Sequence, residues 1–157
     1  MPSRRAAIQL SDAEVRELLE NGKTIVICSS GRDGVPHPMP MWYGLDPDGS
    51  VVMTTFARSQ KVKNLERDPR VALLLEDGES YAELRGVVVY GRAELEREVE
   101  RVLDTLARVS ARYQAGAGAD PKALRAALRS QAAKRVALRV RPERVVSWDH
   151  RKLGGAY

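Results

Sequence analysis

The 157-residue sequence contains a single cysteine, Cys28, and only two histidines. No internal disulfide can form, and no Cys/His cluster with the spacing of a zinc site is present. This cysteine usage is typical of a reducing compartment, so we expect a cytoplasmic protein. A chain of this length can bury a core of its own, and we expect residues 1–157 to form a single domain.

Long apolar runs are also absent. No stretch approaches the roughly 20 apolar residues that a membrane-spanning helix needs. The segment Met1–Ala7 carries two arginines, but no apolar region follows it as it would in a signal peptide. We therefore expect no membrane association.

Aromatic residues make up only 5% of the chain, whereas basic residues exceed acidic ones and give a net charge of +5. Excess positive charge suits either a nucleic acid or an anionic small ligand. The charges are mixed along the chain, and so few aromatics provide little surface for stacking on bases, so we expect no nucleic-acid partner. A G-x-S-x-G elbow, a Walker loop and a G-x-G-x-x-G sequence are all missing.

What the sequence does contain is a series of short strand and helix signals. Ser11 and Glu14 have the spacing of a capping box, at the start of a helix that Asn21-Gly22 ends. Three extended segments follow, which predict an antiparallel meander over residues 23–56. The second of them contains three prolines, which favours an edge strand. The segments are residues 23–30, 36–45 and 50–56.

The remainder of the chain alternates in the same way. The sequence predicts helices at 59–68 and 94–114 and from Pro121 onward, and strands at 71–76, 81–94 and 135–140, with 145–148 either extending the sheet or leaving it. Ala115–Asp120 is a glycine-rich break. We therefore expect an α+β, mainly β fold, in which an antiparallel β-barrel, closed or nearly closed, carries flanking helices.

The most informative stretch is residues 54–65 (TTFARSQKVKNL), where a strand ends and a short turn leads into a helix. The free amides and the dipole of a helix N-terminus favour an anion. Ser59, Lys61 and Lys63 add a hydroxyl and two cations, and Thr54 and Thr55 add hydroxyls at the strand end. A phosphate monoester needs such surroundings. The alternative is that Ser59 is only an N-cap and that the lysines are solvated.

Two other stretches are candidates for ligand contacts. The extended segment 36–43 (PHPMPMWY) offers a flat apolar surface for a planar ring, with His37 and Tyr43 as candidate proton donors. The alternative is that the methionines of this segment only fill the core and that His37 has a structural role. The end of the chain, 147–157, has an aromatic residue followed by basic ones, which either closes over an anionic planar ligand or frays.

Four features, in this order and spacing, resemble the pyridoxamine-phosphate-oxidase-like flavin and deazaflavin oxidoreductases. They are the N-terminal helix, the G-x-P-like second strand (residues 34–40), the S-x-K-x-K-N-L block (59–65) and the D-P-R-V sequence (68–71). The resemblance covers residues 8–95 well. It implies an FMN-binding split β-barrel, a homodimer with two cofactor sites at the subunit interface, and oxidoreductase activity toward a small-molecule acceptor.

The resemblance also implies site residues. Pro38, Met39, Pro40 and Met41 would run beside the ring, and Thr54, Thr55, Ser59, Gln60, Lys61, Lys63 and Asn64 would hold the ribityl chain and phosphate. In the tail 147–157, which looks like that of a deazaflavin-dependent branch, Trp148, Arg151 and Lys152 would reach the partner subunit's cofactor. No metal ligand is assigned, because the sequence has no Cys/His cluster, and no catalytic side chain is assigned, because the cofactor itself would carry the hydride.

The chain departs from the vitamin B6 oxidases of this family. Those enzymes have an arginine near the start of the second strand and an Arg-Lys pair at the phosphate, where this sequence has His37 or Pro38 and Gln60-Lys61. The arginine motif that grips pyridoxal phosphate is not recognisable at the C-terminus. We therefore expect coenzyme F420 as the cofactor, with FMN as the alternative. A cofactor carrier of the same fold, without turnover, is the alternative to an enzyme.

Overall fold

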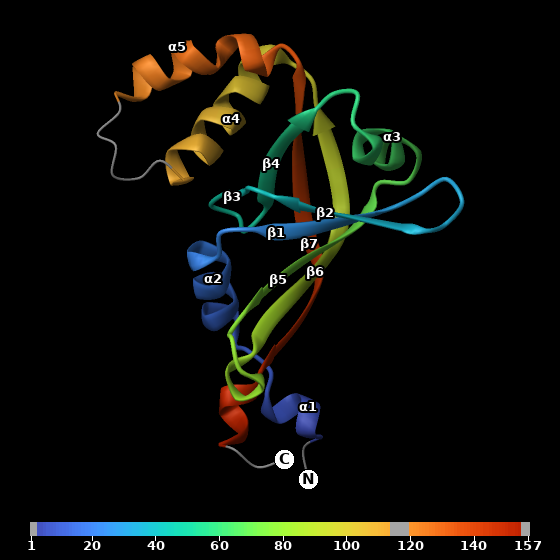
Figure 1. Cartoon of the computed structure of the whole chain (residues 1–157), viewed down its shortest axis with the longest axis vertical. Coiled ribbons are helices and arrows are strands. Elements are labelled where there is room, and N and C mark those ends of the chain that lie inside the picture. Colours follow the sequence, from blue (N-terminus) through green and yellow to red (C-terminus); the bar gives the residue numbers. More distant parts are fainter. Residues whose placement is uncertain (1–2, 114–119, 155–157) are drawn as a thin grey trace.

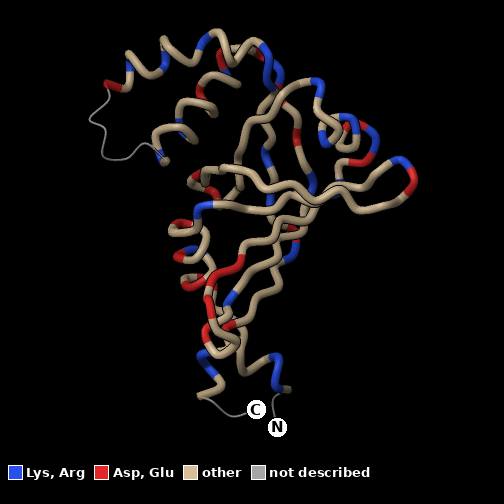
Figure 2. The backbone as a smooth tube through the Cα atoms, in the orientation of Figure 1, with Lys and Arg blue, Asp and Glu red and all other residues tan. Residues whose placement is uncertain are grey.

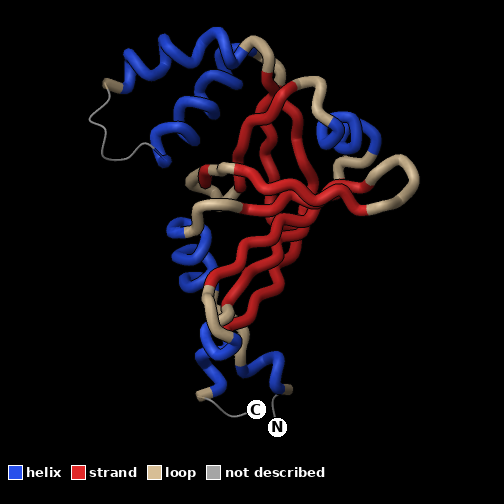
Figure 3. Tube along the Cα trace, viewed as in Figure 1, coloured by secondary structure: helices blue, strands red, loops and turns tan. Residues whose placement is uncertain are grey.

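A computed structural model describes residues 3–113 and 120–154, and a seven-stranded antiparallel sheet dominates it (Figures 1 and 3). The strands are β1 (Ile25–Ser30), β2 (Pro36–Met41), β3 (Gly44–Leu45), β4 (Val51–Phe56), β5 (Arg70–Asp77), β6 (Arg85–Glu96) and β7 (Arg135–Asp149). The helices are α1 (Arg4–Ala7), α2 (Asp12–Asn21), α3 (Gln60–Arg67), α4 (Val99–Tyr113) and α5 (Pro121–Ala132), with the 3-10 turns η1 (Tyr81–Glu83) and η2 (His150–Leu153). None of the helices within this part of the chain is long and apolar enough to cross a membrane.

The order of the strands explains why the sheet curls. Its order is β2-β1-β5-β6-β7-β4-β3, so β2 and β3 are the two outermost strands. Only Trp42 and Tyr43 separate them along the chain, which brings the two edges of the sheet together. The core inside the curl is formed by fully buried side chains such as Ile27, Met53 and Leu138. This arrangement confirms the predicted α+β split-barrel class.

The predicted meander over residues 23–56 is wrong in one respect. β1 and β2 pair as expected, but β4 pairs with β7 and with the short β3. The extended segment 36–45 is interrupted at Tyr43, whose ring is fully buried and whose hydroxyl donates a hydrogen bond to the Leu19 carbonyl at 2.5 Å. Burial of this ring turns the chain, so the two halves of the segment pair with different strands.

Several other boundaries differ from the prediction. The strand expected at 81–94 starts at Arg85, because Ser80 and Glu83 form a capping box around η1. The helix expected at 94–114 starts at Val99, since residues 94–96 still pair with β7. The segment 145–148 stays in the sheet as part of β7. Residues 115–119 of the predicted glycine-rich break lie outside the described residues.

The edge position predicted for the proline-rich strand is confirmed. β2 is the first strand of the sheet, and among the described residues it pairs on one side only, with β1. Pro36, Pro38 and Pro40 alternate along it, opposite residues 30, 28 and 26 of β1. Alternate residues of a strand direct their backbone groups to the same side, so the missing N–H groups lie on one side of this strand.

Replacing Gly86 with alanine should destabilise the protein. Gly86 lies opposite Trp148 in the β6–β7 pair, and a Cβ at this glycine would lie 2.3 Å from Cζ2 of the indole. We expect Gly86→Ala to lower the free energy of unfolding by about 2 kcal/mol through overpacking. Chemical denaturation measures this loss of stability. Gly44→Ala is the control, because a Cβ at Gly44 would lie at an ordinary contact distance of 3.4 Å from the nearest atom of Val52. Equal stability of the two variants would contradict this packing.

Candidate functional site

The turn between β4 and α3 leaves hydrogen-bonding groups free. Ser59 is the N-cap residue of α3, but its hydroxyl makes no capping bond to the helix and instead accepts from Thr55 Oγ1 at 3.5 Å. The amides of Val62 and Lys63 donate to the Ser59 carbonyl at 3.1 and 3.3 Å. Within the described residues, the amides of Gln60 and Lys61 have no such acceptor. The helix start therefore presents two amides and one hydroxyl, at the positive end of the helix dipole.

Lys61 is buried beneath this turn. Its side chain is largely shielded, with the residue 7% exposed, and Nζ donates a hydrogen bond to Thr55 Oγ1 at 3.1 Å. In the part of the chain that the structure describes, no carboxylate lies within 4 Å of this amine. Burial lowers the pKa of Lys61, because desolvation penalises the ammonium form.

Thr54 and Lys63 lie apart from this arrangement. Thr54 and Thr55 are consecutive on β4, so their side chains point to opposite faces of the sheet. Thr54 pairs with Ala137, which packs against α4 and α5. Lys63 is exposed on α3. The structure therefore brings Thr55, Ser59, Gln60 and Lys61 together but does not add Thr54.

Asn64 fastens α3 to the barrel. Its side chain is fully buried, donates to Ser29 Oγ at 3.1 Å and accepts from Gln60 Nε2 at 2.9 Å. Arg67 forms a second hydrogen bond between α3 and β1 by donating to the Ser30 carbonyl at 2.6 Å. These bonds hold the middle and the end of α3 against the end of β1. Sequence reasoning missed Arg67, although its spacing of three residues from Asn64 on a helix was a signal that the two share a face.

A pocket of about 500 Å³ lies beside α3 and joins it to the start of β2. Gln60 and Asn64 line one side and His37 lines the other, so the first two sequence motifs meet here. Arg32 and Asp33, from the turn between β1 and β2, also line the pocket, and Asp33 Oδ1 accepts a hydrogen bond from the Val35 amide at 3.1 Å. Sequence reasoning missed Arg32, because a turn residue that faces a helix about 30 residues away leaves no local pattern.

From this pocket, β2 continues along the edge of the sheet. Pro38, Met39 and Pro40 are exposed there, while Met41 is half-buried against the core. The hydroxyl of Tyr43 instead donates to the carbonyls of Leu19 and Gly22, and burial raises its pKa. Of the two candidate proton donors, the structure places His37 at the pocket and Tyr43 in the core.

The predicted tail residues lie at the other end of the molecule from α3 (Figure 1). Trp148 packs on Gly86, and Arg151 forms a two-point contact with Asp149, at 2.9 Å from Nε and 2.6 Å from Nη2. Lys152 donates to Glu14 Oε2 at 2.7 Å. Within one chain these three residues do not meet the β4–α3 turn, and their approach to a partner's site stays a prediction. Residues 155–157 of the tail lie outside the described residues.

Replacing Glu14 with glutamine should weaken the attachment of η2 to α2, which depends on the ion pair between Lys152 and Glu14. Hydrogen bonds from Lys152 and Ser11 lower the pKa of Glu14 from 4.5 to about 2. A carboxylate whose pKa is lowered by folding stabilises the fold above its ordinary pKa, and this contribution is lost as the pH falls. In a Trp42→Phe background, Trp148 emission should shift between pH 4.5 and about 2, and Glu14→Gln should reduce that dependence, leaving the part that comes from Asp149, whose pKa is lowered by Arg151. Glu20→Gln is the control, and an unchanged profile in Glu14→Gln would refute the anchor.

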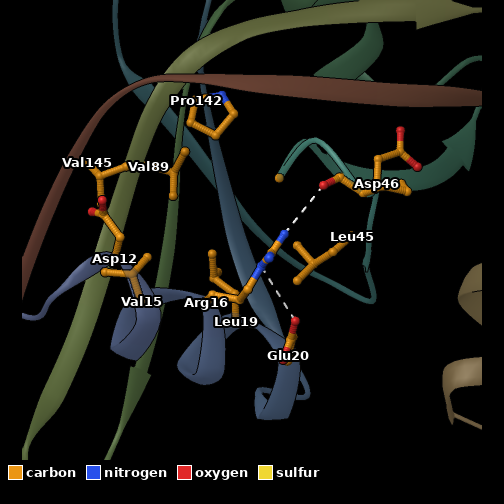
Figure 4. A pocket seen from close by; sticks show the side chains of 12 residues that line it. Asp12, Val15, Arg16, Leu19, Glu20, Leu45, Asp46, Val89, Pro142 and Val145 are labelled. Atoms are coloured by element: carbon orange, nitrogen blue, oxygen red, sulfur yellow. Dashed lines mark hydrogen bonds and ion pairs between the residues drawn. The ribbon is translucent and has the colours of Figure 1, made fainter.

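A second pocket, of about 530 Å³, lies between α2 and the sheet (Figure 4). Its walls are mostly apolar, and its rim carries three carboxylates and one arginine. That arginine, Arg16, is engaged by Glu20 and by the Pro47 carbonyl. A phosphate is therefore unfavourable in this pocket. Its apolar wall residues are Val15, Leu19, Leu45, Val89, Pro142 and Val145.

Comparisons with known proteins agree with this architecture. A family model described as "Pyridoxamine 5'-phosphate oxidase" matches residues 11–149. The crystal structure of conserved hypothetical protein Rv2991 from Mycobacterium tuberculosis is 38% identical, with a TM-score of 0.88 over 99% of this chain and 95% of that one.

More distant structures share the fold. A structure titled F420 reductase is 24% identical, with a TM-score of 0.63 over 83% of this chain and 94% of its own. A FAD-binding protein from Mesorhizobium loti is 20% identical, with a TM-score of 0.65 over 88% and 94%. No curated protein matches the sequence. The family model and the 38% identical structure show that the chain belongs to the pyridoxamine 5'-phosphate oxidase family.

Proposed function

We propose that the protein is an oxidoreductase that holds a flavin-type cofactor by its phosphate at the start of α3. In this proposal the cofactor is coenzyme F420, with FMN as the alternative, and a hydride passes between it and a small organic acceptor. The observation that carries the proposal is the buried amine of Lys61, which has a hydroxyl but no carboxylate as its neighbour.

A buried ammonium group without a counter-ion is costly, and a bound phosphate would supply the missing negative charge. The same phosphate would accept hydrogen bonds from the amides of Gln60 and Lys61 and from Ser59 Oγ. These donors point out of a helix N-terminus, where the dipole also favours an anion. Charge-assisted hydrogen bonds of this kind are the strongest that a protein forms with a phosphate.

The ring would extend from this phosphate along the exposed edge of β2. Pro38, Met39 and Pro40 offer apolar surface there, and His37 lies at the pocket between β2 and α3. When bound, the cofactor supplies the hydride chemistry. The residues of this chain would hold the phosphate and orient the ring, and no side chain needs to act as an acid or a base.

We also propose that the protein works as a homodimer. The outer face of the sheet carries a row of aliphatic residues that pair across four strands, namely Val26, Leu74, Val88 and Val146. They are half-buried or exposed in the single chain, with Leu74 37% exposed. Trp148 continues this face, so a partner subunit packed on it would bring the tail toward the other subunit's site.

Titration of the cofactor-free protein with F420 and with FMN, followed by fluorescence, tests the proposal. We expect one of them to bind at micromolar concentration or tighter, and failure of both would contradict it. Mass determination in solution tests the dimer. An enzyme should then reoxidise the reduced cofactor with an acceptor from a panel of organic compounds. Tight binding with no reoxidation would favour the cofactor carrier.

A further inference from the structure

The turns at one end of the sheet concentrate unpaired positive charge. Residues 49–65 and 121–142 contain no aspartate and no glutamate. Other arginines of the second segment form ion pairs with carboxylates on other elements. Arg139 Nε, for example, lies 3.0 Å from Asp46 Oδ2. In the described residues no carboxylate lies within 4 Å of Arg58, Lys134 or Arg135. Figure 2 shows basic residues at the junction of α5 and β7 and on α3.

These three cations belong to two turns that touch each other. The Ala57 amide donates to the Lys134 carbonyl at 3.0 Å, and Phe56 pairs with Arg135 in the β4–β7 ladder. A pocket of about 480 Å³ lies between the turns, lined by residues 56–58 and 133–134. Arg58 and Lys134 are exposed at this pocket, so their charges are available to a ligand.

Phe56 lines this pocket, and Arg135 packs on its ring. The guanidinium carbon of Arg135 lies 4.4 Å from the centroid of the Phe56 ring, and Phe56 is 58% exposed. The Nε atom of Arg135 is buried and has no hydrogen-bond partner among the described residues. The shielded Nε atom cannot itself reach a ligand, so Arg135 contributes to the pocket through the positive charge that it places beside it.

From these observations we infer that residues 56–58 and 133–135 form a second anion subsite, which takes a negatively charged group that the ligand carries beyond its phosphate. The inference rests on the proposed function, because Ser59 lies in the adjoining phosphate site. Ala57 and Ser59 are two residues apart, which is at most about 7 Å of chain. Thr55 and Phe56 face opposite sides of β4, so such a ligand would pass over the turn 57–59.

The subsite would distinguish cofactors by charge. FMN ends at a single phosphate monoester and cannot reach past the turn. FAD carries a second phosphate, and the phosphodiester of F420 continues into carboxylates. Two surface cations that meet one anionic group strengthen binding by modest amounts each, and together by about tenfold. Comparing the affinities of FMN, FAD and F420 therefore shows whether the second anionic group is a phosphate or a carboxylate.

The test uses Arg58→Gln/Lys134→Gln, with Arg92→Gln/Lys122→Gln as a control of equal charge change at exposed positions elsewhere. Dissociation constants of FMN, FAD and F420 are measured by fluorescence, and those of orthophosphate and inorganic triphosphate by calorimetry. We expect the test variant to weaken FAD or F420 by about tenfold and FMN by less than about twofold. Triphosphate should lose its advantage over orthophosphate in that variant alone.

Two outcomes separate the subsite from the proposed function. If no flavin-type ligand binds but triphosphate is held through Arg58 and Lys134, the proposed function fails and the anion subsite stands. If the wild type shows no preference for triphosphate, or if the test and control variants weaken all ligands equally, the subsite is overturned. Loss of FAD binding alone identifies a pyrophosphate as the anion, and loss of F420 binding alone identifies carboxylates.

Discussion

Replacing Lys61 with methionine should weaken phosphate-linked cofactor binding by about 10- to 100-fold. The amine is buried and lies 3.1 Å from Thr55 Oγ1, at the start of the helix that would hold the phosphate. Methionine fills nearly the same space as the lysine stem but removes the charge. Fluorescence titration with F420 and FMN measures the loss, and Lys122→Met on the exposed face of α5 is the matched control.

The same substitution should stabilise the cofactor-free protein by about 1 kcal/mol, as is common where a binding site carries strain or unpaired charge. This opposite sign separates a ligand-binding lysine from a structural one. A structural lysine would lower the free energy of unfolding on removal. Unchanged affinity together with reduced stability in Lys61→Met would therefore contradict the phosphate site.

The gain in the free energy of unfolding that we expect for Lys61→Met should also depend on pH. Burial lowers the pKa of Lys61 in the folded state below its ordinary value of 10.5. Between these two values the unfolded chain binds more protons than the folded one, so the stability of the wild type rises with pH in that window. Denaturation curves recorded toward pH 10.5 should show the stability gap between wild type and variant closing.

Replacing Arg112 with alanine should lower the free energy of unfolding by about 3 kcal/mol. Arg112, in the last turn of α4, donates to the carbonyls of Leu19 at 2.9 Å, Glu20 at 2.8 Å and Gly22 at 2.5 Å. These are carbonyls at the end of α2, which a helix cannot satisfy from within itself. Its guanidinium also covers the Tyr43 ring, 4.2 Å from the centroid. One side chain thus ties together α4, α2 and the corner between β2 and β3.

Thermal and chemical denaturation measure this effect. Arg101→Ala, on the same helix but in an exposed ion pair with Glu96, is the control and should change stability by no more than about 0.5 kcal/mol. Arg112→Lys should recover only part of the loss, because one ammonium group cannot reproduce the fork of a guanidinium. A loss in Arg112→Ala as small as that of Arg101→Ala would show that these contacts are not important for stability.

Local patterns predicted most of the elements correctly. The capping box at Ser11 and Glu14 is present, with Ser11 Oγ accepting from the Glu14 amide at 3.3 Å. The edge position of the proline-rich strand follows from the missing N–H groups, which no partner strand has to satisfy. Both predictions depend only on residues a few positions apart, so the sequence contains all that is needed to make them.

The errors arose where distant residues compete for the same segment. The extended segment 36–45 divides because Tyr43 is buried against α2, which no pattern within the segment reveals. Ser59 has the sequence of a helix cap, yet its hydroxyl does not cap α3. Arg32 and His37 join the pocket beside Gln60 only because the β1–β2 hairpin folds back toward α3.

The sequence by itself determined the elements, the prolines at the sheet edge and the motif order of the family. Turn propensity, capping and alternation act over short distances along the chain, so they can be read from it directly. Only the tertiary structure decided that Lys61 is buried without a carboxylate and that the tail residues lie at the opposite end from α3. The physical reason is that burial and ion pairing depend on which distant segments pack together, and that is settled by the curl of the sheet.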